Sequence, residues 1–300
     1  MVLRFSNPIF EAIWNNKLID NIQISLNEKL GVGTRGDYYE QAGAIRDMVQ
    51  NHIMQILSLV AMEPPVNLKT DSIRTEKLKV VEAIEEITPE FLRDNIVFGQ
   101  YGRGIIDGIE VPGYVEEGRV PKDSRTETFV AMKLHINNFR WAGTPFYIRT
   151  GKRLGNYGAE IVIQFKDLPN ILYFKDSNIQ EPNLLVIRIQ PNVGVFFQFN
   201  TKDFSTHHDI VPTKMDTSYA NPSQGNTPEA YERLIYDILR GDSTLFSRWD
   251  EVEATWTFAD KIIRYREQSN VKFPNYEAGS MGPMEAIKLL ENDNRKWWNI

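Results

Sequence analysis

Apolar residues recur at helical spacing in the segment that follows a glycine-rich loop. The loop carries Gly31, Gly33 and Gly36, and a Pro64-Pro65 pair ends the apolar segment. At about 100° per residue, one stripe of a helix collects Ile45, Met48, Val49, Ile53, Ile56, Leu59 and Val60. His52 lies in the middle of that stripe. The pattern predicts a long amphipathic helix with a histidine on its apolar face.

This histidine has two interpretations. It can be a neutral core residue with both ring nitrogens hydrogen-bonded, or a general base in a cleft of low dielectric, oriented by a carboxylate. Asp47 precedes His52 by five residues, and in an α-helix the two side chains point about 140° apart. An orienting carboxylate would therefore come from elsewhere, and the helix alone leaves both interpretations open.

Segments of strand character dominate the middle of the chain. Ile22, Ile24 and Leu26 alternate with polar residues and predict a half-buried strand. Further strands are predicted at 130–136, 145–150, 160–165, 184–190 and 193–199, and helices at about 71–84, 227–241 and 250–266. Helices segregated from consecutive strands favour an α+β fold. We expect one domain, 1–300, with a large, mainly antiparallel sheet and helices packed on one face.

Residues 99–128 are rich in glycine and charge, and we expect them to form a long flexible loop. Gly102, Gly104 and Gly108 come close to the G-x-G-x-x-G dinucleotide fingerprint, but the last spacing is wrong and no helix follows. The sequence therefore predicts no dinucleotide-binding unit of the usual kind within this chain.

Composition excludes several classes of protein. The chain has 300 residues, 42% of them hydrophobic, and a net charge of -6, which argues against binding nucleic acid. It has no cysteine and only four histidines, so neither disulfides nor a metal site is expected. No apolar run is long enough to span a bilayer and no targeting leader is visible. We expect a soluble, cytoplasmic protein without a membrane partner.

Several blocks resemble one enzyme family. The segment from Arg46 to Leu57 resembles a signature helix of glucose-6-phosphate dehydrogenase. Other blocks that resemble the family, in the same order, are 1–5, 146–152, 186–191, 230–234 and 276–283, with Met281 where the family usually has tryptophan. The resemblance covers the family's C-terminal domain in its bacterial type. It implies that the chain begins just after the family's Asp-His-Tyr-Leu-Gly-Lys-Glu motif, and that the N-terminal NADP-binding domain lies outside it.

The resemblance also implies roles for single residues. His52 matches the base that removes the proton from the C1 hydroxyl of the sugar. Glu28 and Asp47 match carboxylates that accept hydrogen bonds from sugar hydroxyls, Lys152 matches a lysine that reaches the substrate, and Gln190 is a weaker match. Without the resemblance, Glu28 is a strand-end charge, Asp47 an acid that favours the helix dipole, and Lys152 a solvated loop cation.

At two places the chain departs from the family. Tyr157 stands where members usually carry a second Lys or Arg that helps to hold the sugar phosphate. Gly158 and Val162 replace two basic residues of the structural NADP site of eukaryotic members, so no such site is expected.

The resemblance implies the sugar-phosphate-binding and dimerisation domain of an enzyme that oxidises glucose 6-phosphate at C1, with NADP as hydride acceptor. We expect a homodimer through the exposed sheet face, and no turnover by this chain alone. The alternatives are a non-catalytic sugar-phosphate-binding or scaffolding domain derived from the enzyme, and a domain of another sugar dehydrogenase.

Overall fold

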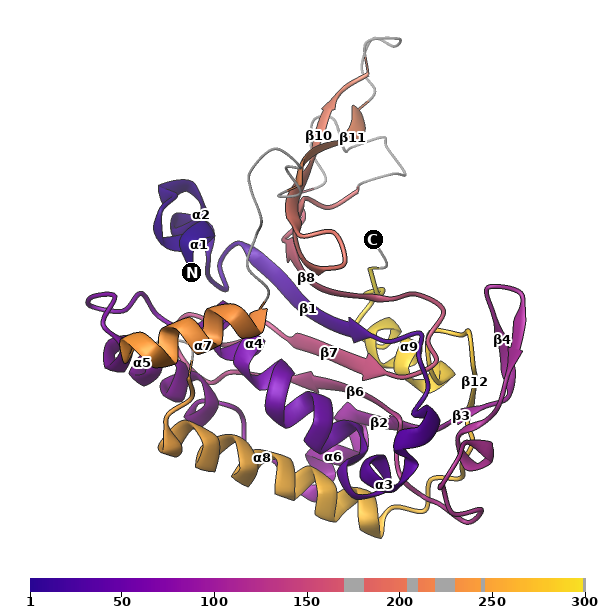
Figure 1. Cartoon of the computed structure of the whole chain (residues 1–300). Coiled ribbons are helices and arrows are strands. Elements are labelled where there is room, and N and C mark those ends of the chain that lie inside the picture. The colour runs from indigo at the N-terminus through magenta and orange to yellow at the C-terminus, as the bar shows by residue number, and fades with distance from the viewer. Residues whose placement is uncertain (170–180, 204–209, 219–229, 244–245, 299–300) are drawn as a thin grey trace.

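The computed structural model describes residues 1–169, 181–203, 210–218, 230–243 and 246–298. An eight-stranded sheet forms its centre, in the order β11-β10-β9-β8-β1-β7-β6-β2 (Figure 1). Its strands are β1 (Ile19–Asn27), β2 (Ile96–Gly99), β6 (Phe129–Leu134), β7 (Phe146–Gly151), β8 (Gly158–Phe165), β9 (Leu184–Gln190), β10 (Gly194–Lys202) and β11 (Ile210–Ser218). Strands β1 and β7 are parallel, and all other neighbours in this sheet are antiparallel. The predicted α+β fold with a large, mainly antiparallel sheet is confirmed.

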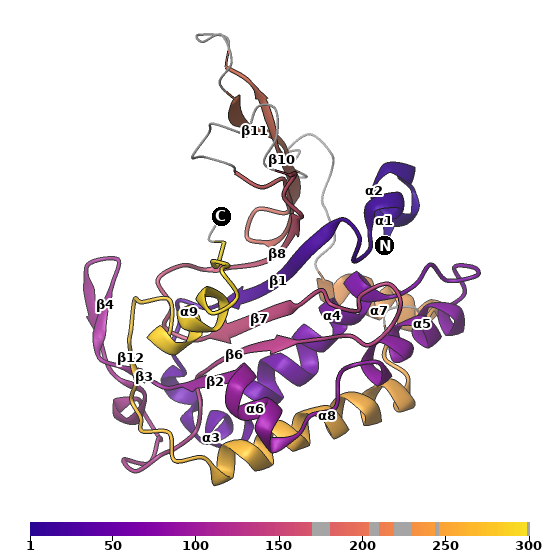
Figure 2. The same cartoon turned by 180° about the vertical axis from the view of Figure 1, so that it is seen from behind.

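The main helical layer covers one face of this sheet. The helices are α1 (Val2–Phe5), α2 (Pro8–Ile13), α3 (Gly36–Ala44), α4 (Met54–Ala61), α5 (Thr70–Glu82), α6 (Pro89–Asn95), α7 (Ala230–Arg240), α8 (Trp249–Gln268) and α9 (Met284–Glu291), with a π-helix η2 (Ile45–Ile53) and 3₁₀ turns η1 (Gly33–Arg35) and η3 (Tyr114–Glu116). Figures 1 and 2 show α4 and α8 on one face of β6 and β7, and α9 on the other. The prediction that the helices pack on one face of the sheet therefore holds for the main helical layer, and α9 forms a smaller layer on the other face.

The alternation of strand side chains separates two cores. Val130 and Met132 of β6 belong to the core under the main helices, whereas Phe129 and Ala131 belong to a second core under α9. The central strands are therefore buried on both faces. This fixes their positions and the positions of the loops at their ends.

The expectation of a flexible loop at 99–128 is wrong. The segment contains β3 (Tyr101–Gly102), which pairs with β12 (Tyr276–Glu277), and a hairpin of β4 (Gly104–Ile106) and β5 (Ile109–Val111). Asp107 and Gly108 form the hairpin turn, with φ angles of 51° and 81°, as the Asp-Gly pair favours. The near-match to a dinucleotide fingerprint thus lies in a hairpin and opens no helix.

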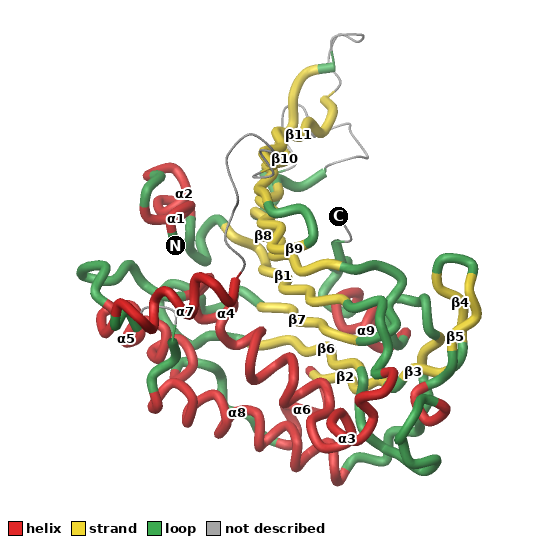
Figure 3. Tube along the Cα trace, viewed as in Figure 1, coloured by secondary structure: helices red, strands yellow, loops and turns green. Residues whose placement is uncertain are grey.

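Strands β10 and β11 extend beyond the helical layer (Figure 3). The predicted helix at 227–241 is α7, and residues 227–229 lie outside the described part of the chain. Over the described ranges, every helix is too short or too polar to cross a membrane.

Candidate functional site

The predicted amphipathic helix is built from three pieces, with η2 between α3 and α4. In a π-helix the hydrogen bonds join residues five apart, as the bond from the Met54 N–H to the Val49 carbonyl shows. Asp47 and His52 are five residues apart, so they lie one π-turn from each other on the same side of η2. The expected separation of about 140° does not apply here, because it assumed α-helical geometry.

His52 is exposed to solvent and does not lie in the core. Ile45, Val49 and Ile53 face the core from η2, and Val60 does so from α4, as the stripe predicted. Met48 and Ile56 are half-buried and Leu59 is 37% exposed. The π-turn shifts the buried positions, so the interpretation of His52 as a core histidine is wrong.

Glu28 and Lys152 meet at the ends of the two parallel strands. Asn27 ends β1 opposite Gly151, which ends β7, so the next residue of each strand emerges at the same edge. The Lys152 ammonium lies 2.6 Å from Glu28 Oε2. Lys152 is only 4% exposed, whereas the Glu28 side chain is 31% exposed. Lys152 is therefore not the solvated loop cation of the alternative interpretation but a buried charge with a carboxylate partner.

Backbone hydrogen bonds fix both residues of this pair. The Glu28 N–H donates to the Gly151 carbonyl at 3.0 Å, and the Glu28 carbonyl accepts from the Leu154 N–H at 2.9 Å. The Lys152 N–H donates to the Thr128 carbonyl at 3.0 Å, and the Tyr276 hydroxyl donates to the Lys152 carbonyl at 2.8 Å. These hydrogen bonds fix the backbone from which each of the two charged side chains extends.

The glycine-rich loop after Glu28 is held against the 99–128 segment. The Val32 N–H donates to the Tyr101 hydroxyl at 3.2 Å. A Cβ at Gly31 would lie 2.3 Å from Glu117 Oε1 and 2.5 Å from Arg153 Nε, so a larger residue would require these two side chains to move. The loop thus packs against the 99–128 segment beside the Glu28–Lys152 pair.

Lys152 contacts Tyr39 of α3, and Asp47 contacts the adjacent Tyr38. The Lys152 ammonium lies 5.0 Å from the centre of the Tyr39 ring, in a cation–π contact. Burial raises the pKa of the Tyr39 phenol, and the nearby charges of Asp47 and Glu28, among others, raise that pKa further. The adjacent Tyr38 hydroxyl donates to Asp47 Oδ1 at 3.3 Å, and the Asp47 charge raises the pKa of the Tyr38 phenol. Nothing in the sequence pattern singled out either tyrosine.

Gln190 lies at the same edge of the sheet but further along it. It ends β9 opposite Ala159 of β8, and β8 lies between β9 and β1. At the usual spacing of strands, Gln190 is about 10 Å from the β1 end. Its side chain is exposed, as is Tyr157, at 49%, just before β8.

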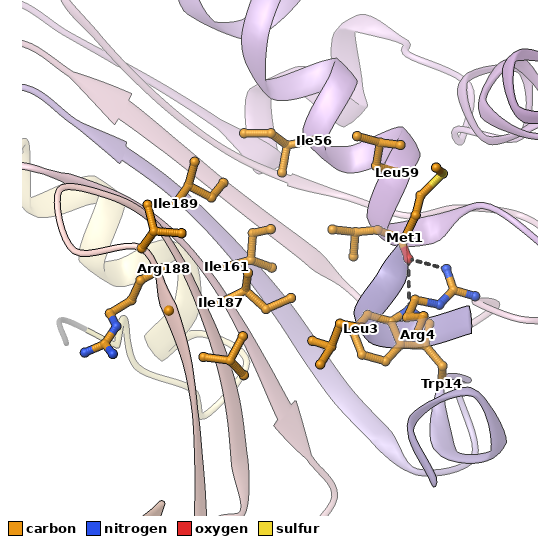
Figure 4. A pocket seen from close by; sticks show the side chains of 14 residues that line it. Met1, Leu3, Arg4, Trp14, Ile56, Leu59, Ile161, Ile187, Arg188 and Ile189 are labelled. Carbon is orange, nitrogen blue, oxygen red and sulfur yellow. Dashed lines mark hydrogen bonds between the residues drawn. The ribbon is translucent and has the colours of Figure 1, made fainter. Parts of the chain in front are cut away.

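A separate apolar groove lies between α1, α4 and strands β8 to β10 (Figure 4). Its volume is about 290 Å³, and Ile56, Leu59, Ile161, Ile187 and Ile189 are among its lining residues. The Arg4 guanidinium donates to the Val60 and Met62 carbonyls and pairs with Glu11, and Arg188 pairs with Asp216. The groove shares no residue with the charged cluster and offers few groups that a sugar phosphate would recognise.

Across the described ranges, no cluster of three or more His, Asp or Glu residues is arranged to hold a metal ion. His135 lies just beyond β6, with its Nδ1 2.9 Å from Glu85 Oε2. The structure thus pairs Glu28 with Lys152, places Asp47 and His52 on η2, and places Gln190 further along the sheet edge.

Fold and site define an α+β sheet domain whose charged residues gather at the carboxyl ends of its only parallel strand pair among the described strands of the main sheet. The chain belongs to the family "Glucose-6-phosphate dehydrogenase, C-terminal domain", whose profile matches residues 1–298. This confirms the family indicated by the sequence blocks.

Curated relatives and solved structures agree with this assignment. The chain is 52% identical over 299 residues to glucose-6-phosphate 1-dehydrogenase of Bacillus subtilis, covering 100% of this chain and 61% of the relative. It is 46% identical to the Mycolicibacterium smegmatis enzyme, covering 99% of this chain and 60% of that relative. It is similar to a glucose-6-phosphate dehydrogenase solved in complex with its substrate glucose 6-phosphate, at a TM-score of 0.88 and 34% identity, covering 99% and 60% of the two chains. The chain therefore spans about 60% of the length of these relatives.

Proposed function

We propose that this chain is the sugar-phosphate-binding domain of a glucose-6-phosphate dehydrogenase. The observation that carries the proposal is the ion pair of the buried Lys152 with Glu28 beside the Tyr39 ring, together with Asp47, which the adjacent Tyr38 hydroxyl binds. An ammonium and two carboxylates can donate to and accept from the hydroxyl groups of a sugar. The similarity to a glucose-6-phosphate dehydrogenase solved with its substrate supports the same ligand for this domain.

In this proposal each residue has a defined task. His52, exposed on the face of η2 that also carries Asp47, removes the proton from the C1 hydroxyl of glucose 6-phosphate. Glu28, Asp47 and Lys152 bind and orient the sugar, and Gln190 contacts its periphery. NADP is the hydride acceptor. The product is 6-phosphogluconolactone, formed in the first step of the pentose phosphate pathway.

The glycine motif at residues 102–108 does not form the strand-to-helix turn that commonly binds the pyrophosphate of a dinucleotide. It runs into the β4–β5 hairpin, where no helix N-terminus is available for a pyrophosphate. We therefore assign NADP binding to the part of the longer relatives outside this chain. Turnover then requires that part, and this chain alone binds the substrate without oxidising it.

The proposal includes a homodimer in the cytoplasm. Strands β10 and β11 extend past the helical layer (Figure 3), and exposed apolar residues, among them Val211 and Met215, lie on β11. An uncovered apolar sheet surface of this kind favours association with a second copy. Light scattering that gives twice the mass of the chain supports this part of the proposal, and a monomer at high concentration contradicts it.

Tyr157 favours the second candidate, a non-catalytic sugar-phosphate-binding or scaffolding domain. It is an exposed tyrosine where the family usually has a cation. A steady-state assay of the longer protein that contains this domain separates the two candidates. The enzyme proposal predicts that NADP is reduced with glucose 6-phosphate, and that His52→Gln lowers kcat/KM by about 100- to 10,000-fold, as loss of a general base does. The control His135→Gln should leave kcat/KM nearly unchanged. Binding without turnover in the wild type would support the scaffold.

A further inference from the structure

We propose that Glu127 is a positioning residue for this site: it fixes the first turn of η2 and thereby the face that carries Asp47 and His52. The inference rests on the proposed function for the roles of those two residues. Glu127 lies near the end of the 99–128 segment, just before β6, and no motif in the sequence marks it.

Glu127 binds the start of η2 with two acceptors. Its backbone carbonyl accepts from the Ala44 N–H at 3.1 Å, and its Oε1 accepts from the Ile45 N–H at 3.3 Å. The first N–H groups of a helix have no partner within the helix, and a carboxylate there also favours the helix dipole. Glu127 thus supplies from a distant segment the cap that no side chain of η2 or α3 provides.

The backbone before η2 is shaped around this carboxylate. Gly43 has φ +62° and ψ 177°, which breaks the helical path between α3 and η2. A Cβ at Gly43 would lie 2.3 Å from Glu127 Oε1. A side chain at this position would be strained by the φ angle, and its Cβ would require the Glu127 carboxylate to move.

Two arginines and a tyrosine from three elements interact with Glu127. The Nε of Arg266 in α8 lies 3.0 Å from Glu127 Oε2, and Arg46 of η2 contributes a second positive charge. The Glu127 charge adds to burial in raising the pKa of the Tyr39 phenol in α3. Glu127 is only 2% exposed. Burial raises the pKa of the Glu127 carboxyl, and the Arg266 charge opposes that rise. The carboxylate therefore joins η2 to α8 at a buried point.

The next residue extends this link to the other half of the site. The Thr128 carbonyl accepts the Lys152 N–H at 3.0 Å, and Thr128 Oγ1 lies 3.0 Å from the Tyr276 hydroxyl. The adjacent residues Glu127 and Thr128 therefore hold both η2, which carries Asp47 and His52, and the backbone of Lys152. A shift of this short segment would move both sets of side chains relative to each other.

Amide hydrogen exchange of this chain tests the link to η2 independently of activity. In Glu127→Gln the amide group cannot satisfy both the Ile45 N–H and Arg266, so we expect exchange across 44–53 to accelerate at least about tenfold. The control is Glu251→Gln, because Glu251 of α8 is also fully buried and is paired, with Lys77 of α5, at 2.7 Å. The control should accelerate exchange in α5 and α8 rather than in η2. Unchanged exchange of 44–53 in Glu127→Gln would overturn the proposal.

Kinetics of the longer protein test the effect on the site. We expect Glu127→Gln to lower kcat/KM for glucose 6-phosphate about 10- to 100-fold, through both a lower kcat and a higher KM, because it displaces groups that orient the sugar and take the proton. Glu251→Gln, with a comparable loss of thermal stability, should change kcat/KM less than about threefold. Equal losses in the two variants would show that Glu127 only stabilises the fold. A wild type without glucose 6-phosphate turnover would refute the proposed function, while the exchange experiment still decides whether Glu127 fixes η2.

Discussion

Lys152, whose ammonium group is buried, is the residue on which the proposed site depends most. Desolvation of a charge is costly, and Lys152 offsets it with the Glu28 carboxylate on one side and the Tyr39 ring on another. The sequence could not reveal this pairing, because the two residues are 124 positions apart and only the parallel contact of β1 and β7 brings them together. The family resemblance named both residues, but not their contact with each other.

Removing the carboxylate from this pair should destabilise the fold. We expect Glu28→Gln to lower the free energy of unfolding by about 1–3 kcal/mol, because it leaves a nearly buried ammonium without its counter-charge. Chemical denaturation measures the change. The control Asp107→Asn breaks the Lys29–Asp107 pair, which is largely exposed, and should cost less than about 1 kcal/mol. Equal losses would mean that the Lys152 charge is solvated in solution.

The Tyr39 hydroxyl is buried and has no hydrogen-bond partner among the described residues. Tyr39→Phe should therefore be neutral or stabilise the fold by up to about 1 kcal/mol, because it removes an unsatisfied polar group and keeps the ring over Lys152. Tyr39→Leu removes the ring and should be clearly destabilising. Thermal unfolding of both variants checks this, and a large loss in Tyr39→Phe would reveal a partner for the hydroxyl.

At the scale of elements, η2 shows where sequence periodicity stops being informative. Helical spacing correctly placed Ile45, Val49, Ile53 and Val60 in the core. It misplaced His52 and Leu59, because a π-turn adds one residue per turn and shifts the positions around it. No glycine or proline between 45 and 53 signals the π-helix, which is built with tertiary contacts such as those of Glu127.

Two glycines with similar φ angles allow a matched test of the helix junction. Gly33 has φ +55° and open space around its Cβ position, whereas Gly43 has φ +62° and Glu127 against it. We expect Gly33→Ala to cost about 1 kcal/mol from backbone strain alone, and Gly43→Ala about 2–4 kcal/mol. Urea denaturation compares the two variants. Equal costs would contradict the close packing of Gly43 against Glu127.

At the scale of the whole molecule, the C-terminal residues explain why β1 is not half-buried as predicted. Its polar residues Asn21, Gln23, Ser25 and Asn27 are all buried. Gln23 donates to the Lys296 carbonyl and accepts from the Trp298 N–H, so the tail covers the polar face of the strand. The alternation predicted which side chains share a face, but local sequence holds no information about a tail some 270 residues away.

One ion pair anchors this tail, and it should make stability depend on pH. Asp20 of β1 accepts two hydrogen bonds from Arg295, at 2.7 and 2.8 Å. Burial alone would raise the pKa of Asp20, but the hydrogen bonds from Arg295 and Asn21 outweigh it and lower that pKa below 3.8. The folded state therefore gains stability above the unfolded pKa of about 3.9 and loses it as pH falls through the lower folded value.

Accordingly, Asp20→Asn should lower the free energy of unfolding by about 1–2 kcal/mol at pH 7, and the gap from the wild type should shrink below about pH 4. Denaturation curves across this range measure the gap. A gap independent of pH would show that the Asp20 charge contributes nothing to the anchoring of the tail.

The central claim is that the Lys152–Glu28 cluster binds a sugar phosphate, and calorimetric titration of this chain with glucose 6-phosphate tests it most directly. Three proteins suffice: the wild type, Lys152→Met, and the control Lys133→Met, whose lysine pairs with Asp293 at 2.9 Å beside α9. We expect binding by the wild type and the control, and binding at least tenfold weaker in Lys152→Met, a loss of about 1.4 kcal/mol or more. Equal binding by both variants, or none by the wild type, would contradict the central claim.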